Sequence, residues 1–184
     1  MAGTLQELGA QVIDADRVAH QLYRPGTPAF DEVARAFGSE IVGRNGEIDR
    51  KKLGQKVFGN AQGLKRLNAI LHPRIADRVK ETLEAWRREG VKVAVVEAAL
   101  LLEAGWGPIV DKVWVTVASE EKAKERLLAA RDLSEAEIEA RMACQMPSDE
   151  RARMADVVID TNGTLEQLRE QTERQWRRLV ATEK

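Results

Sequence analysis

The chain has 184 residues, with 29 Lys and Arg against 30 Asp and Glu, two His and one Cys. This length suits one domain with a buried core, and 43% hydrophobic with 32% charged residues is typical of a folded protein rather than a disordered one. A net charge of -1 argues against a dedicated nucleic-acid binder, which would carry a basic surplus. The apolar run at 93–102 is too short for a membrane span, and one Cys excludes an internal disulfide. We therefore expect a cytoplasmic enzyme, monomeric or weakly self-associating, with no nucleic-acid or membrane partner.

Four short segments are predicted to be strands, at 11–14, 91–97, 112–118 and 156–160. The last three are rich in Val and Ile and almost continuously apolar, which is typical of strands buried on both faces. Because helical stretches separate them, the pattern predicts an α/β fold with a parallel sheet covered by helices.

Capping residues predict where several helices begin and end. Thr27 followed by Pro28 starts one helix, and Gly38 ends it. Pro73 is expected to open another helix, which ends near Gly90. Two further starts have the spacing of a capping box, Ser134 to Glu137 and Thr164 to Gln167.

The spacing between the strands is uneven. Nearly eighty residues separate the first two strands, far more than a crossover connection needs. The excess predicts a helical lobe at about 24–86, and a second helical insert is expected at about 119–154. Inserts at the strand ends of an α/β sheet commonly close over a ligand.

Two carboxylates, Asp14 and Asp16, directly follow the first predicted strand. Open α/β sheets bind ligands at the carboxyl ends of their strands, so both side chains can reach one site. One carboxylate could orient a hydroxyl or accept its proton, and one could hold Mg²⁺ through water. Equally, either residue could simply cap the following helix.

Arginines gather in and beside the second insert, where guanidinium groups could neutralise phosphoryl oxygens. They are Arg126, Arg131, Arg141, Arg151 and Arg153. The same segment is rich in Glu, so solvated helix faces explain any single arginine as well.

Other polar positions give weaker signals. Glu97 and Glu103 flank the end of an apolar strand, where an unpaired charge would be costly to bury. His72 beside Pro73 is typical of a hinge or a packed residue, and two His are too few for a histidine metal site. Asn162-Gly163 indicates a loop first and a nucleotide contact second.

Several segments, in order along the chain, resemble the dephospho-CoA kinase family. They are ELGAQVIDADRVAHQL, RPGTPAFDEVARAFG, NGEIDRKKLGQKVF, LNAILHPRI, EAALLLEAGW and QMPSDERARMADVVIDTNG. The resemblance implies transfer of the ATP γ-phosphoryl group to the 3′-hydroxyl of dephospho-CoA, with Mg²⁺. It also implies a P-loop kinase-like fold with a helical CoA-binding lobe and an arginine-bearing lid.

The resemblance also implies roles for individual residues. Asp16 would accept or orient the attacking hydroxyl, and Asp14 would support it or the metal. The lid residues Arg131 and Arg141 would contact phosphates. Asn162 and Gly163 would lie near the adenine. The residues on the dephospho-CoA side would be His72, Glu103 and Asp14.

The chain departs from the family at its phosphate loop. The family opens with a strand and a G-x-x-x-x-G-K-[ST] loop, and neither occurs in this sequence. Because that strand is central in P-loop folds, its neighbours are expected to flank a gap with unpaired edges. The 184-residue chain is therefore predicted to be a very poor kinase of marginal stability. A valine codon misassigned as the start at Met1 is one hypothesis for the shortened sequence.

Two other functions remain open at this point. One is a catalytically inactive relative that still binds CoA or adenine nucleotides through the helical lobe. The other is a small-molecule kinase acting on a nucleoside monophosphate, which the VIDAD and LHP segments disfavour.

Overall fold

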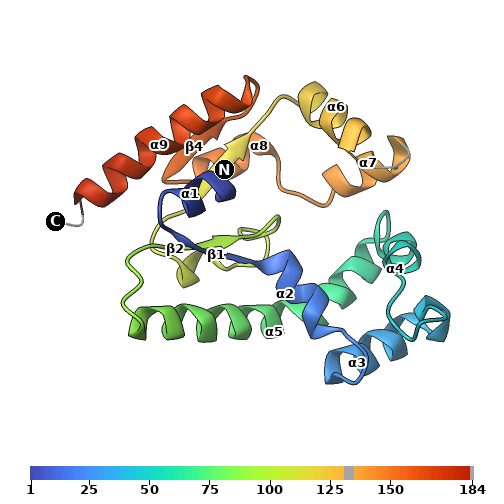
Figure 1. The fold of residues 1–184 in the computed structure, drawn as a ribbon. Coiled ribbons are helices and arrows are strands. Elements are labelled where there is room, and N and C mark those ends of the chain that lie inside the picture. Colours follow the sequence, from blue (N-terminus) through green and yellow to red (C-terminus); the bar gives the residue numbers. More distant parts are fainter. Residues whose placement is uncertain (131–134, 183–184) are drawn as a thin grey trace.

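The computed structural model describes residues 1–130 and 135–182, and within them helices alternate with short strands (Figure 1). The N-terminal elements are α1 (Ala2–Glu7), β1 (Gln11–Asp14), α2 (Ala15–Leu22), α3 (Pro28–Phe37), α4 (Arg50–Val57) and α5 (Ala61–Arg88). The C-terminal elements are β2 (Ala94–Glu97), β3 (Trp114–Val117), α6 (Glu120–Ala130), α7 (Glu135–Met142), α8 (Ser148–Arg153), β4 (Val157–Asp160) and α9 (Leu165–Thr182). Short 3₁₀ turns occur at Ser39–Ile41 and Gly107–Ile109.

The four strands form two parallel pairs, which confirms the predicted parallel α/β class. β1 pairs with β2, Gln11 opposite Ala94, and β3 pairs with β4, Trp114 opposite Val157. Among the described residues no strand joins the pairs, so β2 and β3 each keep one unpaired edge. This is the gap expected of a P-loop fold without its central strand.

β1 occupies its predicted range, but β2, β3 and β4 are shorter and less buried than the sequence predicts. β2 contains no buried residue, and β3 contains one, Val115. Apolar strands become buried on both faces only when neighbours complete the sheet. Here the facing edges of β2 and β3 are open, so the prediction of burial on both faces is wrong for these strands. It is also wrong for β4, where Ile159 is the one buried residue and Val158 is exposed.

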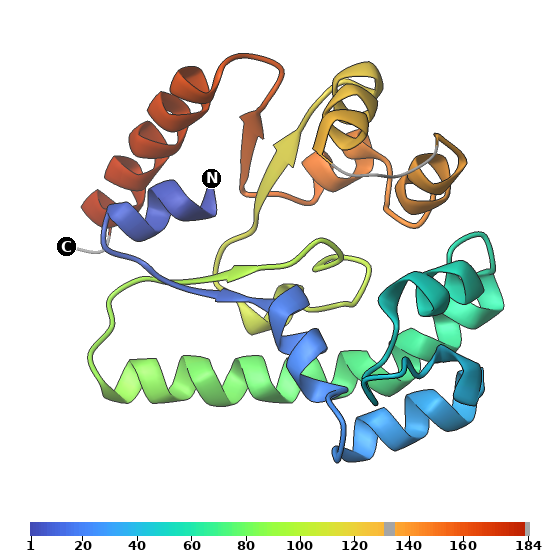
Figure 2. The same ribbon diagram turned by 45° about the vertical axis from the view of Figure 1, so that its right-hand side comes forward.

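The main hydrophobic core lies among the helices rather than over the strands. Val33 of α3, Ile41 of the following turn and Val79 of α5 are fully buried in it. Figure 2 shows α2, α3 and α4 gathered around the N-terminal half of α5, while the C-terminal half of α5 runs below β1 and β2. The long helix α5 thus joins the helical part of the molecule to the first strand pair.

Pro73 lies inside α5 and does not open a helix, so that prediction is wrong. Proline removes one backbone hydrogen bond from a helix interior, and this cost is offset here by packing. Leu71, Ile75 and Val79 are buried on the same helix, on both sides of the proline. Arg74 also donates to the Ile70 carbonyl oxygen (2.6 Å) next to the proline turn.

Two of the predicted caps are confirmed. The Thr27 hydroxyl accepts from the Phe30 backbone N–H (3.2 Å) at the start of α3, which ends at Gly38 with a φ of 90°. Thr164 and Gln167 form a reciprocal capping box at the start of α9, with bonds of 2.9 and 3.2 Å. The box expected at Ser134 lies outside the described residues.

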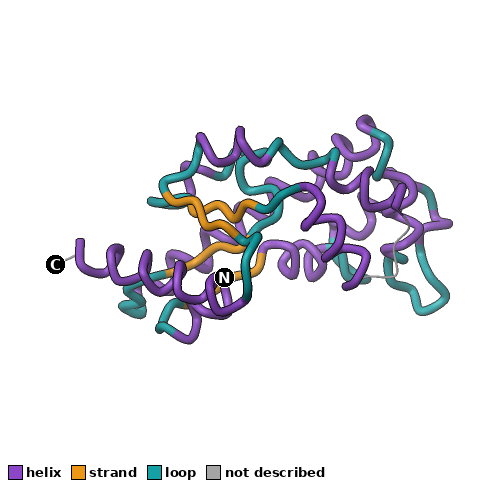
Figure 3. Tube along the Cα trace, turned by 90° about the horizontal axis from the view of Figure 1, so that it is seen from above, coloured by secondary structure: helices purple, strands orange, loops and turns teal. Residues whose placement is uncertain are grey.

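The remaining helices surround the second strand pair. α9 packs against β4 and α1, and Arg169 of α9 pairs with Glu7 of α1 at 3.0 Å. Seen from above, all the strands lie in one half of the molecule and the other half contains only helices and loops (Figure 3). None of the described helices is long and apolar enough to cross a membrane.

Candidate active site

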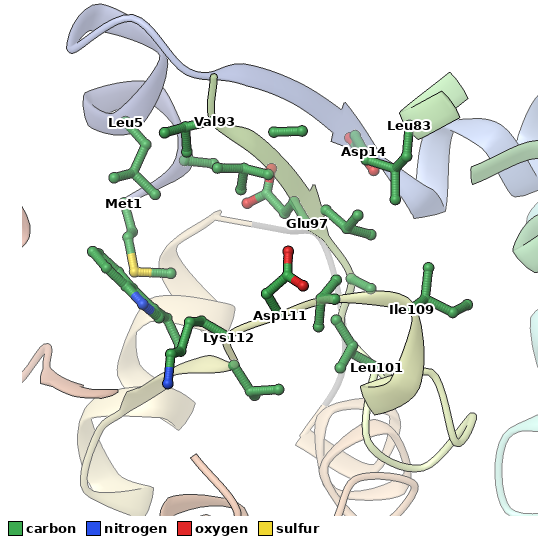
Figure 4. Close-up of a pocket in the computed structure, with 18 of the residues that line it drawn as sticks. Met1, Leu5, Asp14, Leu83, Val93, Glu97, Leu101, Ile109, Asp111 and Lys112 are labelled. Carbon is green, nitrogen blue, oxygen red and sulfur yellow. The ribbon is translucent and has the colours of Figure 1, made fainter. Parts of the chain in front are cut away.

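A cavity of about 1240 Å³ separates the two strand pairs. Its walls include all of β2, β3 from Trp114 to Thr116, the C-terminal half of α5, and residues of α1, α8 and α9. Figure 4 shows the space between β2 and the segment leading into β3, with the Asp111 carboxylate directed into it. The cavity therefore occupies the gap that the unpaired strand edges leave.

Asp14 and Asp16 both line this cavity, as predicted from their position after the first strand. Asp14 is the last residue of β1 and also the N-cap of α2, and its Oδ1 accepts from the Arg17 backbone N–H at 3.0 Å. Asp16 lies in the first turn of α2 with an exposed side chain. The capping role thus falls to Asp14, and Asp16 faces the cavity.

Three further polar side chains form the electrostatic surroundings of this carboxylate pair. Burial lowers the pKa of His20 most, Arg50 lowers it further, and the charges of Asp16 and Asp14 oppose the shift. Burial also raises the pKa of Tyr23, on which Arg50 and Asp16 act in opposite directions. The rings of His20 and Tyr23 pack edge to face, with centroids 5.8 Å apart. The charges of Arg50 and Asp16 therefore act, with opposite sign, on the same two side chains.

Glu103 lines the cavity, but its carboxylate already has a protein partner. Its Oε1 accepts from the Met146 backbone N–H at 2.7 Å. This bond ties the loop after β2 to the segment that enters α8, where Gln145 and Arg151 also line the cavity. The structure thus places Glu103 at the site as an anchor for the base of the second insert.

Asn162 and Gly163 lie outside the cavity, on an exposed loop after β4. The Asn162 Oδ1 accepts from the Ser119 backbone N–H (2.8 Å), and its own N–H donates to Asp160 (2.7 Å). Arg126 donates to the Thr161 hydroxyl beside them (3.3 Å). These bonds join the carboxyl end of β3 to the carboxyl end of β4, beside the start of the second insert.

His72 is also away from the cavity. It is half-buried on α5, and its ring packs edge to face on Trp106 with centroids 5.6 Å apart. Burial lowers its pKa. The structure therefore gives His72 a packing partner and does not bring it to Asp16 through any described contact.

Two predicted phosphate contacts lie beyond what the structure describes. Arg131 lies in the undescribed range 131–134, and Arg141 belongs to α7 but its side chain is outside the described part. Both assignments remain predictions.

Asp111, Lys112 and Arg50 are among the polar residues that the sequence analysis missed. Asp111 and Lys112 line the cavity at the amino end of β3, where the strand-end rule predicts no ligand. Arg50 immediately follows Asp49, the N-cap of α4, and nothing in its own spacing links it to Asp16. Only the folding of the lobe onto α2 brings its charge close.

The described residues contain no group of three or more His, Cys, Asp or Glu that could hold a metal ion. A Mg²⁺ site of the usual kind needs only one or two protein carboxylates, because substrate phosphates and water complete the octahedron. Asp16 and its neighbour Asp14 fit that lesser requirement.

Comparisons with known proteins decide the family. The family model described as dephospho-CoA kinase matches residues 1–167. The chain belongs to the dephospho-CoA kinase family. Members of this transferase family include the enzyme of Geobacter sulfurreducens, 46% identical over 172 residues, which cover 94% of this chain and 87% of that protein. The dephospho-CoA kinase of Symbiobacterium thermophilum is 44% identical over 177 residues, 96% of this chain and 74% of that one.

Solved structures agree with the family assignment. The dephospho-CoA kinase from Campylobacter jejuni has a TM-score of 0.68 and 25% identity, over 97% of this chain and 89% of that one. A Thermus thermophilus crystal structure has a TM-score of 0.75 and 29% identity, over 98% and 88%. The P-loop kinase-like fold class is therefore confirmed.

Proposed function

We propose that the cavity is a dephospho-CoA kinase site, in which the ATP γ-phosphoryl group passes to the 3′-hydroxyl of dephospho-CoA. The observation that carries this proposal is the position of Asp16, in the first turn of α2, facing the cavity at the end of β1. A carboxylate there can accept the hydrogen bond of an attacking hydroxyl and later its proton. Asp14 is occupied as a helix cap, so it orients the start of α2 rather than reacting.

The helical part of the chain binds the dephospho-CoA side in this proposal. Arg50 lies on the lobe side of Asp16, where its guanidinium group can neutralise a substrate phosphate. The second insert, at about 119–154, covers the ATP side. Asp16 or Asp14 would hold Mg²⁺, which would offset the negative charge that the transferred group meets.

The rate is expected to be low. Phosphoryl transfer depends on positioning and charge neutralisation, and a G-x-x-x-x-G-K-[ST] loop supplies backbone N–H groups, a Lys and a Mg²⁺ ligand for it. The 184-residue sequence contains no such loop. The helical lobe and Asp16 do not depend on such a loop, so we expect the chain to bind dephospho-CoA even where catalysis is slow.

Calorimetric titration of dephospho-CoA into the 184-residue chain tests this function. Saturable binding that weakens in Arg50→Gln, together with slow ATP-dependent formation of CoA, supports a kinase site. Lys51→Gln is the matched control, because Lys51 is exposed on the same first turn of α4, whereas Arg50 is the residue whose charge acts on His20 and Tyr23. Binding without any CoA formation supports the alternative, an inactive CoA-binding relative. Absence of binding contradicts both.

A further inference from the structure

The helices of the second insert form a packing unit of their own. α6 and α7 lie side by side (Figure 2), and an ion pair between Lys124 and Glu139 joins them at 3.2 Å. Ile138 of α7 is fully buried, and it lies outside the main core of the helical lobe. Because such a helix pair can move as one body about the segments that connect it to the chain, its position depends on what holds its two ends.

A side-chain oxygen holds each end of this insert. At its start, the Ser119 N–H donates to the Asn162 Oδ1 at 2.8 Å. At its end, the Met146 N–H donates to the Glu103 Oε1 at 2.7 Å. Asn162 follows β4, which pairs with the strand that leads into the insert, whereas Glu103 belongs to the loop after β2. The two ends are therefore tied to different strand pairs.

The loop that carries Glu103 is itself fixed to the helical core. Leu101 packs against that core, and Trp106 is buried in it with its ring against His72. The Trp106 N–H also donates to the Leu101 carbonyl at 3.0 Å, which closes the turn around Glu103. The bond from Met146 to Glu103 thus ties the end of the insert to the helical lobe, across the gap between the two strand pairs.

We infer that Glu103 is a positioning residue, which acts through the Met146 N–H to hold the second insert over the nucleotide side of the cavity. The inference rests on the proposed function, which places ATP under this insert. A carboxylate that accepts a backbone N–H makes a charge-assisted bond. Without that bond the insert spends less time in the position that binds the nucleotide, so the apparent affinity for ATP falls by the same fraction. Binding of dephospho-CoA to the lobe does not depend on it.

Glu103→Ala and Glu103→Gln test the inference together, because Gln keeps an oxygen that can accept the Met146 N–H and Ala does not. Glu84→Ala is the matched control, since Glu84 is another exposed carboxylate on the cavity wall, with no hydrogen bond or ion pair to any residue that the structure describes. ATP and dephospho-CoA are titrated separately into the wild type and the three variants. We expect the Kd for ATP to rise about threefold to tenfold in Glu103→Ala and to stay close to the wild-type value in the other two. The Kd for dephospho-CoA should be unchanged in all of them.

Limited trypsin digestion reports the position of the insert independently of ATP. Cleavage within α6 and α7 is expected to be faster in Glu103→Ala than in the wild type and Glu103→Gln, because a released insert opens more often. Equal cleavage rates in all three proteins overturn the inference.

The binding data can overturn the inference separately from the proposed function. An equal loss of ATP affinity in Glu103→Ala and Glu103→Gln overturns it, because the charge rather than the bond would then matter. Unchanged ATP affinity in Glu103→Ala, or a wild type that binds dephospho-CoA but not ATP, also overturns it while dephospho-CoA binding stands. If the wild type binds neither substrate, the proposed function fails as well.

Discussion

Asp14 and Asp16 are two residues apart, and the structure predicts that they contribute in different ways. Asp14 caps α2 with a 3.0 Å bond from the Arg17 N–H, so Asp14→Ala removes the acceptor of an otherwise unpaired helix N–H. Loss of such a cap costs about 1 kcal/mol. For a chain of this size the change corresponds to a fall of about 2–4 °C in the melting temperature. Asp14→Asn retains the acceptor and is expected to unfold close to the wild-type temperature.

Asp16 has a smaller expected effect on stability. As an acidic residue in the first turn it interacts favourably with the helix N-terminus, a contribution of about 0.3–1 kcal/mol. Urea unfolding, monitored by circular dichroism, gives the free energies of unfolding of the wild type, Asp14→Ala, Asp14→Asn and Asp16→Asn. The reasoning is refuted if Asp14→Asn loses as much stability as Asp14→Ala, or if Asp16→Asn loses more than Asp14→Ala.

Three further outcomes follow from the structure. In a parallel sheet, alternate residues of a strand bond to the neighbour on one side and to the neighbour on the other. The Val93 and Val113 carbonyls bond toward β1 and β4, so the N–H groups of Ala94 and Trp114 face the gap and should exchange faster than those of Val95 and Val115. Equal protection would show that the facing edges are paired. Because burial lowers the pKa of His72 in the folded chain, its neutral form stabilises the fold above about pH 6.5, and this contribution is lost as the pH falls; urea unfolding at pH 7.5 and 5.5 should show a smaller pH effect in His72→Gln than in the wild type, and an undiminished effect would exclude His72 as a source. Ile41 is fully buried, so Ile41→Val should cost about 1 kcal/mol in chemical unfolding and Ile41→Ala about 2–5 kcal/mol; equal losses would mean that the turn collapses around the smaller side chain.

Local sequence signals predict those parts of the fold that are determined locally. The Thr27 cap, the Gly38 end and the Thr164–Gln167 box depend on residues within one turn, and all three are confirmed. Pro73 shows where local reasoning fails, because α5 continues through it with buried side chains on both sides. The apolar patterns of β2 and β3 predict strands but not their exposure, which depends on a neighbour that the described chain does not place between them.

In the candidate site, too, some residues could be predicted from the sequence and others could not. Asp14 and Asp16 were predictable because the carboxyl end of a strand is a general ligand position, and both line the cavity. Arg50 and Asp111 were not predictable, because tertiary packing alone brings them near. For Glu103 the position was predictable but its bond to the Met146 N–H was not, since 43 residues separate the two.

The central claim is that Asp16 serves phosphoryl transfer to dephospho-CoA in this cavity. The most direct test is the rate of CoA formation from ATP and dephospho-CoA, followed by chromatography, in the 184-residue chain and in Asp16→Asn. We expect slow, dephospho-CoA-dependent formation of CoA that falls about 10²-fold or more in Asp16→Asn, with dephospho-CoA affinity little changed. An Asp16→Asn variant that forms CoA at the wild-type rate would contradict it.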